Sequence, residues 1–155
     1  MKKTVIYLHG KGGSAEEAEF YRPLFPGWEV TGFDYRARTP REAKEELPSF
    51  FDKTVNPGDP VILIAVSLGA FLVMHALSGR SISLALLISP VADMEGLILN
   101  MMAAAGVSED ELRKSSEIAT SFGETLSWNY LCYVRKSIRL TGISPAKFYT
   151  AKKTA

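Results

Sequence analysis

The sequence is short of the residues that many functional sites require. Its 155 residues include one cysteine, Cys132, and two histidines, His9 and His75. A single cysteine excludes an internal disulfide and favours a reducing, cytoplasmic setting. Spacings such as Cys-x-x-Cys and His-Glu-x-x-His are absent. The sequence therefore predicts no metal site and no other cofactor.

The sequence also lacks an excess of charge of one sign, and it has no long apolar run. The net charge is +1, with 18 basic and 17 acidic residues, so no nucleic-acid partner is expected. No run approaches the roughly 20 apolar residues of a membrane span. Met1-Lys-Lys-Thr4 leads straight into a short strand, unlike a secretory signal, and no membrane partner is expected. A hydrophobic content of 46% indicates a soluble domain with a proper core.

Short apolar strands alternate with helical segments along the first ninety residues. The expected strands are 4–8, 28–33, 61–66 and 83–89. Capping boxes at Ser14/Glu17 and Thr39/Glu42 predict helices that run to about Leu24 and Phe51. Such alternation implies right-handed crossovers. The expected fold is three-layer α/β with a mostly parallel sheet of about four strands.

The third of these strands ends on a serine flanked by small residues, in Ala65-Val-Ser67-Leu-Gly69. A segment with helical apolar spacing, 71–77, follows. A strand, Ser-x-Gly and a helix make the layout of a nucleophile elbow, which lifts the serine hydroxyl above the sheet edge. The ordinary alternative is that Ser67 only caps a helix, a role that serine favours. The strand before it and the helix after it favour the nucleophile.

The first strand ends in a glycine-rich loop, His9-Gly-Lys-Gly-Gly13. Such a loop can point backbone N–H groups at an anion, so a phosphate cradle is one interpretation. The loop matches neither Gly-x-x-x-x-Gly-Lys-[Ser/Thr] nor Gly-x-Gly-x-x-Gly, which speaks against that interpretation. His9 is expected to fix the loop through a structural hydrogen bond rather than to transfer a proton.

The elbow and the His-Gly loop together resemble the α/β-hydrolase superfamily, of the serine esterase or acyl hydrolase type. The resemblance covers roughly the first ninety residues, with Ala65 in place of the usual first glycine. It implies that Ser67 is the nucleophile. It also implies that backbone N–H groups of Lys11 and Leu68 form the oxyanion hole, each worth about 3 kcal/mol. His9 and Gly10 would then support the loop.

The catalytic triad that the resemblance implies is incomplete. The family order is serine, acid, histidine, and no histidine follows His75. His75 lies about two helical turns beyond Ser67, some 10 Å away along the axis, and is expected to be a packing residue. Asp93, just beyond the strand 83–89, is a candidate for the acid, because some branches of the family carry the acid there.

The pattern changes after Pro90, where helices are expected at 96–105, 108–120 and 127–136. A capping box at Ser108/Glu111 opens the second of them. The sequence thus divides into three parts: an α/β-hydrolase core at 1–92, a helical cap-like insertion at 93–140, and an aberrant tail at 141–155.

The tail lacks the strand and acid that the resemblance implies at this point. Read in a frame shifted by one base, the genetic code forces Ile or Val across Lys147/Phe148 and then Leu and Tyr or His. Asp or Asn follows across Lys153/Thr154. We therefore hypothesise that a one-base frameshift before about Thr141 truncated an α/β hydrolase. The strand 83–89 would then be an exposed edge, open to self-association.

The function that these features predict is hydrolysis of carboxylic esters or related acyl substrates by a serine nucleophile. The partner would be a small-molecule ester. Without its histidine the chain should turn over far more slowly than a complete enzyme, because triad members act as a unit. The alternatives are a catalytically inactive remnant and a small-molecule or phosphate-binding module.

Overall fold

The computed structural model describes residues 1–137 and 148–151. The chain divides into two compact units. Among the described residues, the first comprises 1–91 and 148–151, and the second comprises 92–137. Each unit has its own core and is described separately below.

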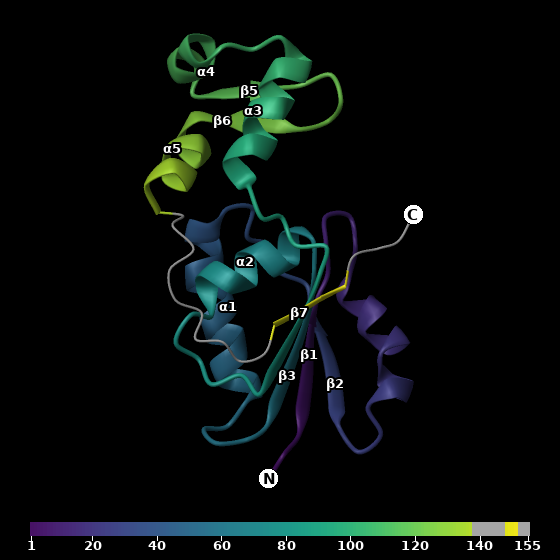
Figure 1. The fold of residues 1–155 in the computed structure, drawn as a ribbon. Coiled ribbons are helices and arrows are strands. Elements are labelled where there is room, and N and C mark those ends of the chain that lie inside the picture. Colours follow the sequence, from purple (N-terminus) through teal and green to yellow (C-terminus); the bar gives the residue numbers. More distant parts are fainter. Residues whose placement is uncertain (138–147, 152–155) are drawn as a thin grey trace. The chain divides into compact units, whose positions relative to one another are not determined.

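The first unit is built on a parallel sheet with the strand order β2-β1-β3-β4-β7 (Figure 1). The four longer strands are β1 (Thr4–Leu8), β2 (Glu29–Phe33), β3 (Val61–Val66) and β4 (Leu84–Ile88). They coincide with the four strands expected from the apolar runs to within one residue at either end. The α/β class and the parallel sheet are confirmed. Because all four strands run the same way, their carboxyl ends meet at one edge.

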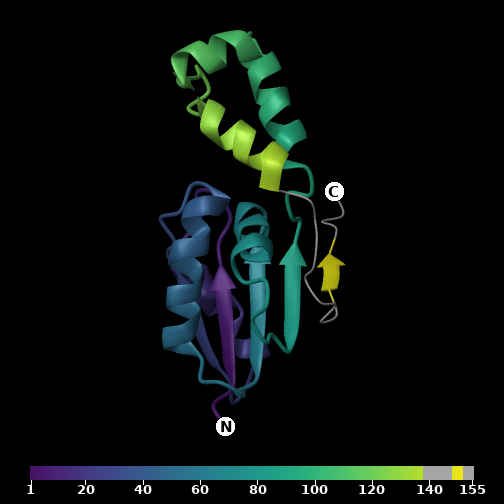
Figure 2. The same ribbon diagram turned by 90° about the vertical axis from the view of Figure 1, so that its left-hand side faces the viewer.

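Helices cover both faces of this sheet (Figures 1 and 2). The helices α1 (Pro40–Thr54) and α2 (Leu68–Ala76) lie on one face. On the other lie two short 3-10 helices, η1 (Ala15–Phe20) and η2 (Arg22–Leu24). The central strands β1 and β3 are therefore buried almost throughout, which is why they read as unbroken apolar runs.

The start of α1 follows the expected capping box. The Thr39 hydroxyl accepts the Glu42 N–H, the Glu42 carboxylate accepts the Thr39 N–H, and Pro40 takes the first helical position. Ala43, Leu47 and Phe51 are the buried side chains on the sheet-facing side of the helix. The helix continues to Thr54, three residues beyond the expected end.

The single helix expected from Ser14 to about Leu24 is wrong. The segment forms η1 and η2, and within the described residues the Ser14 side chain makes no capping bond. Glu17 accepts a hydrogen bond from the hydroxyl of Tyr7 on β1 instead. A tyrosine hydroxyl brought this close to the core needs a partner, and that need overrides the local capping pattern.

The tail contributes a strand that the sequence did not predict. Phe148–Ala151 forms β7, which pairs with β4 in parallel from Ala85 to Ile88. The expectation that β4 would be an exposed edge is therefore wrong, because its unpaired backbone groups accept a neighbouring extended segment. The rest of the expected aberrant tail, 141–147 and 152–155, lies outside the described residues.

The second unit contains α3 (Met94–Ala105), α4 (Glu109–Ser115), α5 (Trp128–Ser137) and a hairpin of β5 (Glu117–Ala119) with β6 (Thr125–Ser127). The Ser108/Glu111 capping box is present. The helix expected over 108–120 ends early, because Ser116 takes a φ of 64° and the chain turns into the hairpin. The buried core of this second unit includes Ile98, Met102, Leu112, Leu126 and Leu131. A cap function for this unit stays a prediction.

Candidate active site

Ser67 lies at the turn from β3 into α2, at the carboxyl edge of the sheet. Its φ of 48° and ψ of −112° are rare for a residue with a side chain, so the turn is strained. Its N–H donates to the Ile88 carbonyl on β4 at 2.9 Å. Within the described residues its hydroxyl makes no capping bond to α2. Helix capping therefore does not explain why serine stands at this position.

The turn is tight because two small residues flank it. Gly69, in the first turn of α2, lies so close to β1 that a Cβ there would stand 2.4 Å from the His9 carbonyl oxygen. Ala65 is fully buried, and its pairing partners in the sheet are Leu8 and Leu87. Alanine thus fits where the usual elbow sequence has glycine.

The glycine loop after β1 lies beside Ser67. A Cβ built on Gly10 would stand 3.4 Å from the Ser67 Cβ. The Gly13 N–H donates to the Gly10 carbonyl at 3.1 Å, which closes a turn that contains Lys11. Leu68 is the first residue of α2, where N–H groups have no acceptor inside the helix. The segments that carry both expected oxyanion donors thus flank the serine.

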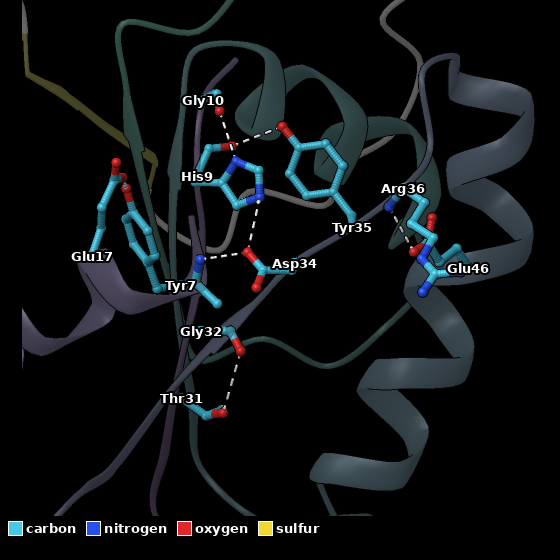
Figure 3. A network of polar contacts seen from close by, with 11 residues as sticks. Tyr7, His9, Gly10, Glu17, Thr31, Gly32, Asp34, Tyr35, Arg36 and Glu46 are labelled. Atoms are coloured by element: carbon cyan, nitrogen blue, oxygen red, sulfur yellow. Dashed lines mark hydrogen bonds and ion pairs between the residues drawn. The ribbon is translucent and has the colours of Figure 1, made fainter. Parts of the chain in front are cut away.

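His9 lies against Gly10, Asp34 and Tyr35 (Figure 3). Its Nδ1 lies 2.7 Å from the Gly10 carbonyl oxygen, an acceptor, so Nδ1 carries the hydrogen of this contact. Its Nε2 faces the Asp34 Oδ1 at 3.5 Å. The ring stacks on Tyr35, with centroids 4.5 Å apart and planes inclined by 11°. These contacts suit a residue that fixes the loop, and they leave neither nitrogen directed at a substrate proton.

Two residues that contact His9 were not singled out from the sequence. Asp34 and Tyr35 follow β2, and the sequence indicates only that they lie in a turn with acidic and basic residues. The Asp34 Oδ1 also accepts the Ala15 N–H at 2.6 Å, and the Tyr35 hydroxyl donates to the His9 carbonyl at 2.8 Å. The signal that could have identified them is topological: β2 neighbours β1, so the residues after both strands meet at one edge.

Comparison with known proteins finds similarity both in sequence and in fold. A protein of Mycoplasma genitalium named as an esterase/lipase is 27% identical over 104 residues, and the match covers 59% of this chain and 37% of that protein. Est1E from Butyrivibrio proteoclasticus superposes on 90% of the chain with a TM-score of 0.62 and 19% identity. The chain has part of an α/β-hydrolase fold. The resemblance expected from the elbow and loop is confirmed at the level of the fold.

Other α/β-hydrolase structures match in the same way. Est1E with ferulic acid bound gives a TM-score of 0.60 at 19% identity, over 89% of this chain and 62% of Est1E. Mouse alpha/beta hydrolase domain-containing protein 10 gives 0.56 at 18%, over 85% of this chain and 60% of its own. The chain spans about 60% of Est1E and 37% of the esterase/lipase. No family model matches it.

The remaining residues of the expected hydrolase site lie elsewhere. His75 is in the last turn of α2, edge-on to Phe71 with centroids 4.7 Å apart. Burial, aided by the charge of Lys44, lowers its pKa below the usual value. Asp93 belongs to the second unit, where its carboxylate accepts the Gly96 N–H at 2.8 Å and caps α3. Its role as the acid stays a prediction.

Two further kinds of feature were sought among residues 1–137 and 148–151. No group of three or more His, Cys, Asp or Glu side chains in these ranges is arranged to hold a metal ion. No helix in them has the length and apolar character needed to cross a membrane.

Proposed function

We propose that this chain is an esterase-like α/β hydrolase in which Ser67 is the nucleophile. The observation that carries the proposal is the strained turn at Ser67 beside Gly10. A residue held at a positive φ costs stability, and such strain persists where a function requires it. The turn sets the serine at the carboxyl edge of a parallel sheet, which is the usual place for ligand sites in α/β folds.

The proposed chemistry begins with attack of the Ser67 oxygen on the acyl carbonyl carbon. The carbonyl oxygen becomes an oxyanion, which the backbone N–H groups of Lys11 and Leu68 would bind. Donors placed for the developing charge, rather than for the ground state, lower the barrier. The serine proton would leave to water. The oxyanion then re-forms the carbonyl as the bond to the alcohol oxygen breaks. The alcohol leaves with a proton taken from water, and the acyl group remains on Ser67.

Among the described residues, neither histidine is placed to act as a general base for Ser67. His9 is committed to Gly10 and Asp34, and His75 packs on Phe71. Removal of the base from a triad leaves only the oxyanion hole and substrate binding, which still give a rate above that in water. We therefore expect slow acylation and even slower hydrolysis of the acyl group.

A small carboxylic ester is the proposed substrate class. The Mycoplasma genitalium protein with a similar sequence is named as an esterase/lipase. Est1E, which shares the fold, has been solved with ferulic acid bound, a small aromatic acid. These similarities support an acyl substrate for the chain and do not distinguish one ester from another.

A phosphate-binding role for the glycine loop is less well supported. A phosphate would need the N–H groups at the start of η1. The first of them, from Ala15, already donates to the Asp34 carboxylate, whose negative charge would also repel the phosphate. The other alternative, a catalytically inactive remnant, is the outcome to expect if Ser67 has no reactivity.

A fluorophosphonate probe tests the proposal. It reacts with an activated serine by forming a bond from the serine oxygen to phosphorus and releasing hydrogen fluoride. We expect slow labelling of the wild-type protein that is lost in Ser67→Ala. Ser89→Ala is the matched control, because Ser89 follows the neighbouring strand and has a φ of 47°. Labelling that survives Ser67→Ala, or a folded wild type that stays unlabelled, would contradict the proposal.

A further inference from the structure

An oxyanion hole works only if its donors are held in place before the reaction. The two proposed donors belong to different segments, Lys11 to the loop after β1 and Leu68 to the start of α2. The loop Gly10–Gly13 has three glycines in four residues and little intrinsic stiffness. The hydrogen bond from Gly13 to Gly10 closes the turn of the loop itself, so contacts from outside are needed to set its distance from α2.

The Asp34 carboxylate lies against both ends of the loop (Figure 3). Its Oδ1 accepts the Ala15 N–H, just after the loop, at 2.6 Å. The same oxygen lies 3.5 Å from the Nε2 of His9, just before the loop. Ser14, the residue that the sequence favoured as the cap of η1, makes no capping bond within the described residues. Asp34, which follows β2, thus accepts an N–H at the start of η1, the role that was expected of the Ser14 side chain.

Tyr35 fixes the loop to α2. Its ring stacks on the His9 ring, and its hydroxyl donates to the His9 carbonyl at 2.8 Å. The same carbonyl oxygen lies against Gly69, where a Cβ would stand 2.4 Å away. The His9 carbonyl is therefore held between Tyr35 and the first turn of α2. Burial raises the pKa of Tyr35 to about 12, so the hydroxyl keeps its hydrogen at neutral pH.

We propose that Asp34 and Tyr35 are positioning residues for the oxyanion hole. They act through His9 and Ala15, setting the spacing between the Lys11 and Leu68 N–H groups without touching the substrate. The inference rests on the proposed function, because an oxyanion hole has meaning only if Ser67 is acylated. It goes beyond that function by assigning the geometry of the hole to the end of β2.

The test uses Asp34→Asn and Tyr35→Phe in the full chain. Tyr35→Phe keeps the ring stack on His9 and removes only the hydroxyl. Asp34→Asn keeps an acceptor for Ala15 and removes the charge that faces His9. Asp52→Asn is the control: it also removes one exposed carboxylate of this unit, from an ion pair with Arg80 at 2.7 Å.

The first measurement is the rate of Ser67 phosphonylation by a fluorophosphonate, resolved into probe binding and the bond-forming step. Loss of a whole oxyanion donor costs about 10²–10³ in rate. For a displaced donor we expect the bond-forming step to fall about tenfold, with probe binding changed less than twofold. Asp52→Asn should match the wild type in both. Unchanged rates in both Asp34→Asn and Tyr35→Phe would overturn the inference.

The second measurement does not depend on reactivity. The Gly13 amide closes the loop turn, and its hydrogen exchange should rise about tenfold in each variant as local opening becomes easier. With only two histidines in the chain, ring ¹⁵N spectra report His9 directly, with His75 as the internal reference. In Asp34→Asn the His9 signals should move and those of His75 should stay.

The two measurements separate the inference from the proposed function. If the wild type is not labelled, the proposed function fails, and unchanged Gly13 exchange in the variants would show independently that Asp34 and Tyr35 do not fix the loop. Faster exchange with unchanged labelling would also overturn the inference, because the loop would then be held without consequence for the reaction. If Asp34→Asn does not fold, Tyr35→Phe alone decides.

Discussion

The His9 carbonyl oxygen and Gly69 are in direct contact, and a side chain at position 69 would place its Cβ 2.4 Å from that oxygen. This contact brings the end of β1 against the start of α2. It explains why a glycine must follow the serine by two residues in this turn. It also links the loop, through His9, to the helix that begins beside Ser67.

Alanine should destabilise the fold at Gly69 but not at Gly10. Gly69→Ala forces a methyl group against backbone atoms, and overpacking of this kind costs about 1–3 kcal/mol. Gly10→Ala meets its nearest atom at 3.4 Å, an ordinary contact, so it should leave the free energy of unfolding nearly unchanged. Urea unfolding measures both. Gly10→Ala should still slow labelling of Ser67, because the methyl lies beside the serine. Equal stability of the two variants would contradict this packing.

His75 should make the fold sensitive to mild acid. Burial lowers its pKa in the folded state below the usual 6.5. The unfolded chain then binds the proton more readily, so stability is present above about pH 6.5 and falls as the pH drops below it. His75→Met removes this dependence. It also removes an Nε2 that has no hydrogen-bond partner among the described residues, so the variant should be at least as stable at pH 7. Identical pH profiles of unfolding for the two proteins would refute this.

Arg135 should contribute more to the thermal stability of the second unit than Arg113 does. Its guanidinium binds Glu95 on α3 at 2.7 Å and Glu109 on α4 at 2.6 Å. Arg113 pairs with Asp110, three residues away on its own helix. Arg135→Met should therefore lower the thermal midpoint of this unit more than Arg113→Met does. The difference should shrink in 1 M salt, since exposed ion pairs are screened. A larger effect of Arg113→Met would be the contrary result.

The sequence pattern located an element where its local preference and its tertiary contacts favour the same structure. The buried strands β1 and β3 and the capping box of α1 could all be located from the sequence, because apolar runs and caps act over a few residues. The turn at Ser67 could be located as well, because strand, Ser-x-Gly and helix follow one another directly. The fold class follows from the alternation of strands and helices.

Other features depended on contacts between distant segments. Glu17 bonds to Tyr7 rather than capping a helix, and Asp34 caps η1 from another strand. The hairpin of β5 and β6 replaces the end of an expected helix, where apolar spacing alone did not reveal the turn at Ser116. The strand β7 arises from a segment without strand alternation, because pairing with β4 uses its backbone. None of these relationships can be read from neighbouring residues.

The frameshift hypothesis predicts what the gene contains. The shifted frame would encode an apolar strand over the same positions as β7 (Phe148–Ala151), followed by Asp or Asn. Sequencing the coding region from about codon 141 should show this frame open, with a histidine codon further downstream. A stop codon at once, or no downstream histidine, would end the hypothesis.

Acyl transfer to Ser67 is the most direct test of the account as a whole. Incubation with p-nitrophenyl acetate should release about one equivalent of nitrophenol slowly, because acylation without a base is followed by even slower hydrolysis. Mass spectrometry of the digested protein should find the acetyl group on the peptide that contains Ser67, and Ser67→Ala should lose it. An acetyl group found only on lysines or on Cys132, or one that is unchanged in Ser67→Ala, would contradict the account.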